Sequence, residues 1–538
     1  MSYDPIRLEI FKHLFASIAE EMGTVLRKSS YSPNIKERRD YSCAVFDAQA
    51  RMIAQAAHIP VHLGSMPLSV RAAIEHFKGD LHPGDAVILN DPFRGGTHLP
   101  DITIVSPVFF VEDQAQKLVG FVASRAHHAD VGGMTPGSMP VGRELFQEGL
   151  IIPPVKLVRA GKVEQAILDL ILANVRTPHE RSGDLMAQLA ANQRGTARLL
   201  DMVSRYGRDE IQTSMSELLA YTERLTRNLI RSLPDGTYTF EDFLDDDGIN
   251  EQSVPIRVKI TIAEDKALVD FTGSAPQQQG NINAVFAITL SAVYYVFRCL
   301  LGLDVPNNSG CLAPVTVIAS EGSVVNALPP AAVAGGNVET SQRIVDVLLG
   351  ALASAAPEKI PAASQGTMNN ITIGGPLLKE RGSFTYYETL AGGSGASLET
   401  DGASAVHSHM TNTLNTPVEA LEYAYPMRVM RYEVRQGSGG AGHTRGGEGL
   451  QRDLQVLVNC QATLLTERRK GHPYGLQGGE PGQCGVNSLI RGEEVIPLAG
   501  KGTVELQPGD VISIQTPGGG GFGEKVEGLR VKAKEENI

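Results

Sequence analysis

The sequence predicts a mixed α+β protein made of several domains. Helix and strand patterns interleave near the N-terminus, amphipathic helices dominate the next stretch, and glycine-rich segments with short strands fill the C-terminal part. With 538 residues, 42% of them hydrophobic, the chain can bury more than one core. We expect an N-terminal α/β domain at residues 1–160 and a helical segment at 161–235. A small antiparallel sheet with helices should follow at 236–360, and a glycine-rich β-containing domain at 361–538.

The N-terminal part opens with a predicted amphipathic helix. Asp4 is a good N-cap residue, Pro5 suits the first helical position, and the apolar residues from Ile6 to Leu26 fall on one helical stripe. A strand, a helix and a second strand should follow, at RRDYSCAVFD, 65–79 and 85–89.

The middle of the chain changes from helices to strands. From Val163 to about Ser232 the periodicity is helical, and after Gly236 alternating apolar residues predict an antiparallel sheet with a turn at Glu264 and Asp265. We expect further helices at 284–303 and 339–356, and a β-rich part with tight turns beyond Pro361.

An acidic run, Asp245-Asp246-Asp247, lies inside the predicted sheet region. A calcium site would need further ligands at EF-hand spacing, and these do not follow. We therefore interpret the run as a solvated loop.

Composition excludes several classes of function. The formal net charge of -12 is spread along the chain, which argues against nucleic-acid or anionic-membrane binding and favours a small-molecule substrate. Five cysteines without a CxxC motif predict neither a disulfide framework nor a zinc knuckle, and indicate the reducing cytoplasm. Neither an export signal nor a membrane-spanning stretch is evident, so we expect a cytoplasmic protein.

The segment DPFRGGTHLPD carries the strongest potential for metal chemistry. His98 and Asp101 lie three residues apart in it, directly after a predicted strand, and strand ends are where loops often place functional residues. The segment AHHAD adds His127 and His128 within thirty residues. Two histidines and a carboxylate can hold one divalent transition metal, such as Fe, Mn or Zn, and leave coordination positions open.

Only one of the two adjacent histidines can face such a site. Side chains alternate along a strand, so His127 shares a face with Phe121 and Arg125, whereas His128 shares the more apolar face with Val122. This pattern favours His127 as the ligand, but because the strand could end earlier, both histidines stay candidates.

Other motifs suggest less chemistry. His407 and His409, followed by Asn412 and Asn415, could bind a substrate or second ion, although a polar loop before a helix starting at Pro417 explains them as well. No GxxxxGK[ST] phosphate loop occurs, so nucleotide binding would need a partner. A serine-hydrolase elbow is also missing.

Eight segments together resemble the hydantoinase B/oxoprolinase family, from Asp4 to Gly523. They are ERRDYSCAVFD, HIPVHLGSMP, NDPFRGGTHLPDI, AHHADVGG, GDLMAQLAAN, GNVETSQRIVD, MTNTLNTPVEALE and SGGAGHTRGGEGL. This family includes the B components of ATP-dependent hydantoinases, the corresponding half of 5-oxoprolinases, and the large components of acetone- and acetophenone-type carboxylases.

The resemblance implies a metal-dependent subunit that works with a partner. A hydantoinase A-type subunit would bind ATP and Mg and phosphorylate a cyclic amide, so the protein would be a hetero-oligomer. In carboxylase relatives the ligands are a His-x-x-Asp pair and a later histidine, which correspond here to His98, Asp101 and either His127 or His128.

We expect this chain to complete the ring opening at the metal. The general base would be the histidine that does not bind the metal, taken as His128, or Asp130. Arg94 and Arg125 are candidate oxyanion or phosphate partners, or members of structural salt bridges. The alternatives are a ketone carboxylase that uses the same ligands and a non-catalytic scaffold for the ATP-binding subunit.

Overall fold

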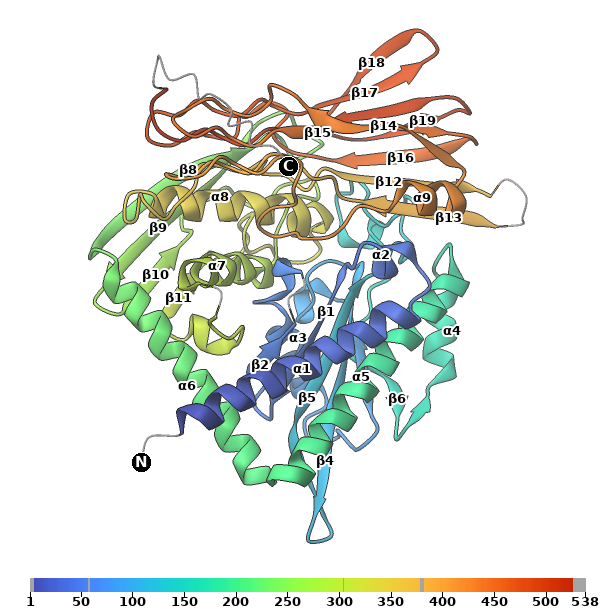
Figure 1. The fold of residues 1–538 in the computed structure, drawn as a ribbon. Coiled ribbons are helices and arrows are strands. Elements are labelled where there is room, and N and C mark those ends of the chain that lie inside the picture. The colour runs from blue at the N-terminus through green and yellow to red at the C-terminus, as the bar shows by residue number, and fades with distance from the viewer. Residues whose placement is uncertain (1–3, 57–58, 303, 378–381, 526–538) are drawn as a thin grey trace, which may run out of the picture.

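The computed structural model describes residues 4–56, 59–302, 304–377 and 382–525, and confirms the mixed α+β class. The described residues form four sheets with helices beside them (Figure 1). In Figure 1 the two C-terminal sheets lie at the top, above the sheet and the long helices of the N-terminal half of the chain.

The N-terminal sheet has the strand order β2-β1-β5-β4-β3-β6-β7, and every pair in it is antiparallel. Its strands are Tyr41–Asp47 (β1), Met52–Gln55 (β2), Ala86–Leu89 (β3), Asp101–Glu112 (β4), Ala115–His127 (β5), Val155–Arg159 (β6) and Lys162–Val163 (β7). Short helical turns lie before β1, at Pro33–Lys36 (α2), and between the later strands, at Pro60–His62 (η1), Pro92–Arg94 (η2) and Leu145–Gln147 (η3).

Helices pack on both faces of this sheet. Helix α1 (Pro5–Ser29) shares a hydrophobic core with β1, β5 and α5, and helix α3 (Met66–His76) shares another with β1, β3 and β5. The predicted cap is confirmed, because the Asp4 carboxylate accepts a 2.9 Å hydrogen bond from the Ile6 N–H. The predicted strands and the helix after Ser65 are likewise confirmed.

The helical middle of the chain is also confirmed. It consists of Gln165–Ala173 (α4), Pro178–Tyr206 (α5) and Arg208–Ser232 (α6). A sheet in the order β11-β10-β9-β8 follows, formed by Gly236–Leu244 (β8), Val254–Ala263 (β9), Lys266–Asp270 (β10) and Val315–Ile318 (β11). Here β8, β9 and β10 are antiparallel as predicted, whereas β11, which follows a helical crossover, runs parallel to β10.

The predicted later helices are Phe286–Leu301 (α7) and Ser341–Leu352 (α8), with the turn Ser309–Leu312 (η4) between them. Leu303, where we expected the first of these helices to end, lies outside the described residues. A π-helical turn, Gly336–Thr340 (η5), leads into α8. Such turns are rare and occur often at functional sites.

The interpretation of Asp245-Asp246-Asp247 as a solvated loop is wrong. Asp245 and Asp247 are buried. The Asp245 carboxylate accepts hydrogen bonds from the N–H groups of Arg469 and Gly471, at 2.6 and 3.0 Å, while Asp247 accepts one from Ile249 at 2.8 Å. Buried carboxylates need such donors, and those of Asp245 come from a segment more than two hundred residues away.

The C-terminal part is β-rich, as predicted. One sheet has the order β13-β12-β16-β19 and another β14-β15-β20-β17-β18. Their strands are Asn370–Pro376 (β12), Ser383–Glu388 (β13), Met427–Arg435 (β14), Gly449–Val456 (β15), Cys460–Leu465 (β16), Val486–Arg491 (β17), Glu494–Leu498 (β18), Lys501–Leu506 (β19) and Val511–Gln515 (β20), with the helix Val418–Ala424 (α9) before β14. The glycines permit close backbone contacts: a Cβ on Gly519 would lie 1.9 Å from the Ser394 carbonyl oxygen.

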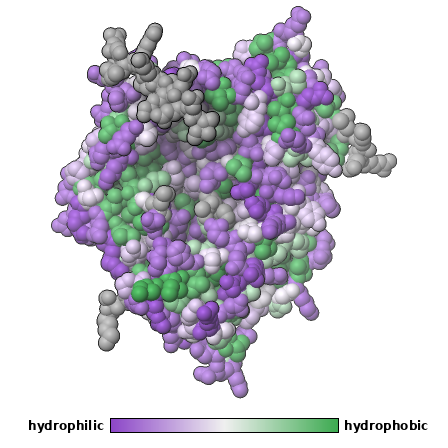
Figure 2. Space-filling model, viewed as in Figure 1, coloured by the Kyte–Doolittle hydropathy of each residue, from purple (hydrophilic) through white to green (hydrophobic). Residues whose placement is uncertain are grey.

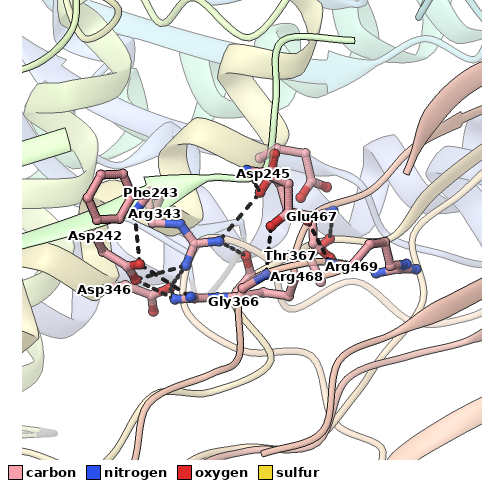
Figure 3. A network of polar contacts seen from close by, with 12 residues as sticks. Asp242, Phe243, Asp245, Arg343, Asp346, Gly366, Thr367, Glu467, Arg468 and Arg469 are labelled. Carbon is pink, nitrogen blue, oxygen red and sulfur yellow. Dashed lines mark hydrogen bonds and ion pairs between the residues drawn. The ribbon is translucent and has the colours of Figure 1, made fainter. Parts of the chain in front are cut away.

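A buried network of charges ties the C-terminal part to the middle of the molecule (Figure 3). Arg343 of α8 contacts Asp242 of β8 at 3.1 Å and Asp346 at 2.7 Å, and Arg468, which follows β16, contacts the same two carboxylates. One hydrophobic core likewise runs from Ile59 to Leu465. The domain boundaries placed from the sequence stay a prediction.

The face of the molecule in Figure 2 is largely hydrophilic, and its apolar areas form separate patches. None of the described helices combines the length and apolar character needed to cross a membrane. The five cysteines are free thiols.

Candidate metal centre

Three of the predicted residues come together in the structure. His98 Nε2 lies 3.2 Å from Asp101 Oδ1, and His127 Nδ1 lies 3.4 Å from the same oxygen. One ligand atom from each residue falls within 4.8 Å of the other two, and all three residues are buried. Among the described residues, this is the one group of three or more such side chains that could hold a metal ion.

The loop before β4 positions His98 beside Asp101. The Asn90 side chain fixes this loop, because its amide donates to the Leu99 carbonyl at 2.8 Å and its oxygen accepts from the Ile152 N–H at 2.7 Å. Gly95 has φ of 91°, and a Cβ on Gly96 would lie 2.4 Å from the Asn90 carbonyl oxygen. The two glycines therefore allow the tight turn that carries His98 back toward the sheet.

The alternation along β5 separates the two adjacent histidines. Ser124 and His128 both hydrogen-bond Gln188 of α5, at 3.3 and 2.9 Å, so they face the side of the sheet on which α5 packs. Arg125 and His127 point to the other side, where Asp101 lies. Of the two candidates, the structure brings His127 and not His128 to the ligand group.

The remaining predicted residues do not join this group. Buried Asp130 accepts two hydrogen bonds from Arg176, at 2.7 Å from the backbone and 2.9 Å from the guanidinium. Arg94 is largely exposed and lies 3.6 Å from Asp91. Fully buried Arg125 donates to the hydroxyls of Thr103, Ser65 and Ser69, at 2.8, 2.6 and 2.6 Å.

The second polar cluster lies near the centre without joining it. His409 is buried with Nδ1 3.4 Å from the Tyr295 hydroxyl, and neighbouring Met410 lines the cavity described below. The predicted helix is confirmed as α9, with Pro417 as its N-cap and Glu419 in its first turn.

The second oxygen of Asp101 is held by its own partners. Oδ2 accepts a 2.8 Å hydrogen bond from the Thr97 hydroxyl and lies 3.4 Å from His62 Nε2. The other nitrogen of His62 lies 2.8 Å from the Ser42 hydroxyl. The carboxylate is thereby oriented so that Oδ1 faces His98 and His127.

The protonation states suit metal ligation. Burial opposes ionisation of Asp101, yet the surrounding His98 and His62 imidazoles hold the pKa of its carboxyl well below the usual range. Burial lowers the pKa of His127, which favours the neutral form of its imidazole. An ionised carboxylate and a neutral imidazole are the forms that bind divalent metals.

Several residues of the site were missed by the sequence reasoning. A small cavity of about 20 Å³, which is room for roughly one water molecule, is lined by Asp101, His127 and also by Asp40, Asn337 and Tyr387. The segments ERRDYSCAVFD and GNVETSQRIVD, which contain Asp40 and Asn337, were part of the family resemblance, but nothing local in them indicated a role.

The residues present fit a resident metal ion. His98 Nδ1 and His127 Nε2, the ring nitrogens that do not face Asp101, are buried and have no hydrogen-bond partner, so neither imidazole is fully satisfied by the surrounding polar network. A cation among two imidazoles and a carboxylate would match the donor set expected for a first-row transition metal. His98, Asp101 and His127 could therefore hold a metal ion.

Sequence comparison places the chain among known proteins. The model of the hydantoinase B/oxoprolinase family matches residues 4–525. A 5-oxoprolinase of Arabidopsis thaliana is 41% identical over 97% of this chain, and a protein described as the B component of a D-/L-hydantoinase of a Pseudomonas strain is 31% identical over 97% of it. The chain spans 42% of the Arabidopsis protein and 90% of the Pseudomonas protein.

Two solved structures share the fold. The ATP-dependent caprolactamase of Pseudomonas jessenii superposes with a TM-score of 0.90 at 29% identity, covering 97% of this chain and 92% of that one. An acetone carboxylase superposes with a TM-score of 0.87 at 19% identity, covering 97% and 76%. The match of the family model over almost the whole chain shows that the protein belongs to the hydantoinase B/oxoprolinase family.

Proposed function

We propose that this chain is the metal-dependent subunit of an ATP-dependent cyclic amide hydrolase. The observation that carries the proposal is the buried convergence of His98, Asp101 and His127 beside a cavity. The similarity to proteins named 5-oxoprolinase and caprolactamase supports a lactam or hydantoin ring as substrate. The carboxylase alternative is weaker, because the acetone carboxylase is 19% identical and shares the fold alone.

The ATP-dependent step belongs, in this proposal, to a hydantoinase A-type partner subunit. The sequence has no phosphate-binding loop, and the chain covers 42% of the Arabidopsis 5-oxoprolinase, which leaves that protein ample length for an ATP-binding half. Similarity to the B component of a hydantoinase supports a hetero-oligomer. The partner would phosphorylate the amide oxygen with ATP and Mg, which makes an otherwise unreactive amide prone to hydrolysis.

The residues of this chain have distinct roles in the second step. His98, Asp101 and His127 would hold the cation, either Zn, Mn or Fe, while Thr97 and His62 keep the Asp101 carboxylate in place. When bound, such a cation polarises a substrate oxygen and favours ionisation of water near neutral pH.

We assign the acceptance of a proton from water to Asp40. Asp40 is the second carboxylate residue that lines the cavity. Its backbone carbonyl accepts a 3.0 Å hydrogen bond from the backbone N–H of His127, which fixes Asp40 beside the proposed metal ligand. His128 and Asp130, which we expected in this role, are engaged with Gln188 and Arg176 instead. The test compares the ring-opening activity of Asp40→Asn with that of His128→Ala, and the assignment predicts the larger loss in Asp40→Asn.

The decisive experiment uses the chain reconstituted with its ATP-binding partner. Hydantoin, 5-oxoproline and caprolactam would be supplied with ATP, and ring opening and ADP release would be followed together. We expect His98→Ala and Asp101→Ala to lose the metal and at least about 100-fold of the ring opening, on the order of a lost metal catalyst. Full turnover by either variant would refute the site, and turnover of a ketone only with bicarbonate would favour the carboxylase.

A further inference from the structure

The aromatic ring of Tyr387 lies flat against a candidate metal ligand. Tyr387 is in β13, far from His127 in sequence, yet the two ring centroids are 4.3 Å apart and their planes differ by 16°. Tyr387 is buried and lines the cavity beside Asp101. A flat surface at stacking distance restricts rotation of the imidazole about its bond to Cβ.

The hydroxyl of Tyr387 begins a chain of hydrogen bonds. It donates to Asn370 Oδ1 at 2.9 Å, and Asn370 Nδ2 donates to Glu339 Oε1 at 2.7 Å. Glu339 also accepts the Met368 N–H at 3.0 Å. Burial raises the pKa of Glu339 to about 8, which favours a neutral carboxyl group over a buried charge at this end of the chain.

The same chain leads to the other histidine of the centre. Glu339 belongs to the π-helical turn η5, and Asn337 of that turn lies 3.1 Å from His98 Nε2 through its side-chain nitrogen. One turn therefore contacts His98 directly and reaches His127 through Asn370 and Tyr387.

A second set of contacts holds Tyr387 from the N-terminal part. The Arg38 guanidinium lies 4.8 Å from the centre of the Tyr387 ring and donates to the Tyr387 carbonyl at 3.2 Å. Its neighbour Asn34 donates to the His127 carbonyl at 2.6 Å. Asn34 thus holds the backbone of His127 and Tyr387 holds its ring. Arg38 contacts both Asn34 and Tyr387 and so links the two.

We propose that Tyr387 is a positioning residue: its ring sets the plane of the His127 imidazole toward the cation, and its hydroxyl anchors the ring through Asn370 to the turn that contacts His98. This inference rests on the proposed metal site. Tyr387 does not itself need to contact the metal or the substrate, so its effect should be visible in metal binding without any turnover.

The test compares Tyr387→Leu and Tyr387→Phe with Tyr386→Leu in the full chain. Tyr386 is the matched control, because it is equally buried in β13 but its hydroxyl contacts Glu388 on the other face of the strand. Co(II) affinity would be measured by competition with a chelator, and the coordination by the visible absorption of Co(II). Thermal unfolding of the metal-free chains would report folding, and His127→Ala would provide the reference for a lost ligand.

We expect Tyr387→Leu to bind Co(II) about 10- to 100-fold more weakly and with an altered spectrum, as for other groups that orient metal ligands. Tyr387→Phe should restore the affinity to within about threefold of wild type, since it lacks one hydrogen bond, and Tyr386→Leu should bind like wild type. If Tyr387→Leu does not fold, Tyr387→Met takes its place, because it fills the space without a flat face.

Three results would overturn the inference. They are wild-type affinity and spectrum in the leucine variant, equal weakening in Tyr387→Phe and Tyr387→Leu, and equal weakening in Tyr386→Leu. Failure of the metal site itself is distinguishable, because wild type would then bind no Co(II) and His127→Ala would change nothing.

Discussion

Asp101 and His127 face each other directly across the β4–β5 hairpin. The antiparallel register pairs the first residue of β4 with the last residue of β5, and it places Asp101 Oδ1 3.4 Å from His127 Nδ1. Because side chains alternate along a strand, a slip of one residue would turn His127 away from Asp101. The hairpin register therefore decides which histidine can join His98 in the site.

Separate substitution of the adjacent histidines should distinguish metal binding from folding. We expect His127→Ala to lose the equivalent of transition metal that the proposed site would hold, since it removes one of the three proposed ligands, whereas His128→Ala should keep the metal. His128→Ala should instead lower stability by about 1–3 kcal/mol, because it leaves the buried side-chain oxygen of Gln188 without the hydrogen bond from His128. Plasma mass spectrometry and urea unfolding of both variants provide the measurements, and loss of metal in His128→Ala alone would reverse the assignment.

The tip of the β4–β5 hairpin has strain that a glycine should relieve. Asp113 and Gln114 form the two-residue turn, with φ of 49° and 62°, a conformation that favours glycine at the second position. Gln114→Gly should raise the free energy of unfolding by about 0.5–1 kcal/mol. Gln116→Gly, in the exposed strand beside it, is the control and should lower stability; a loss in both would contradict the turn conformation.

Glu148 should make the protein less stable as the pH rises. Its carboxylate accepts the N–H groups of Val333 and Ala334, both at 2.8 Å, and burial raises its pKa to about 8 from the ordinary 4.5. Between pH 4.5 and about pH 8 the unfolded chain releases the proton of this carboxyl group while the folded chain keeps it. The free energy of unfolding therefore falls progressively as the pH rises to about 8.

The matching variant is Glu148→Gln, which keeps an acceptor for both N–H groups but cannot ionise. We expect its stability relative to wild type to increase by about 2 kcal/mol or more between about pH 5 and pH 8. Urea unfolding at the two pH values is the measurement. Exposed Glu75→Gln should show no such change, and a pH-independent difference for Glu148→Gln would disprove the prediction.

The buried charge network should be far more sensitive than a surface ion pair. Arg343→Ala leaves the carboxylates of Asp242 and Asp346 without one of their partners and should cost about 3–5 kcal/mol. Arg257→Ala removes an ion pair with Glu241 that is half exposed and should cost at most about 1 kcal/mol. The free energy of unfolding of both variants would be measured by denaturant unfolding. Comparable losses in Arg343→Ala and Arg257→Ala would show that the buried network does not stabilise the protein more than a surface ion pair.

Much of the local structure could be predicted because its causes are local. The Asp4 cap, the apolar stripe of α1 and the alternation in β5 depend on neighbouring residues, and the structure contains all three. The same reasoning failed for Asp245, whose hydrogen-bond donors come from Arg469 and Gly471. An acidic run gives no local indication of whether distant backbone N–H groups will bury it.

The sequence by itself determined the α+β class and the spacing of His98 and Asp101 after a predicted strand, and it favoured His127 over His128 as the site-facing residue without deciding between them. Only the tertiary structure decided which histidine meets Asp101, because this depends on the register of the hairpin. It also brought in Asp40, Asn337 and Tyr387, which lie far apart along the chain. Their contacts result from packing between distant segments, and no periodicity or spacing in a single segment encodes that packing.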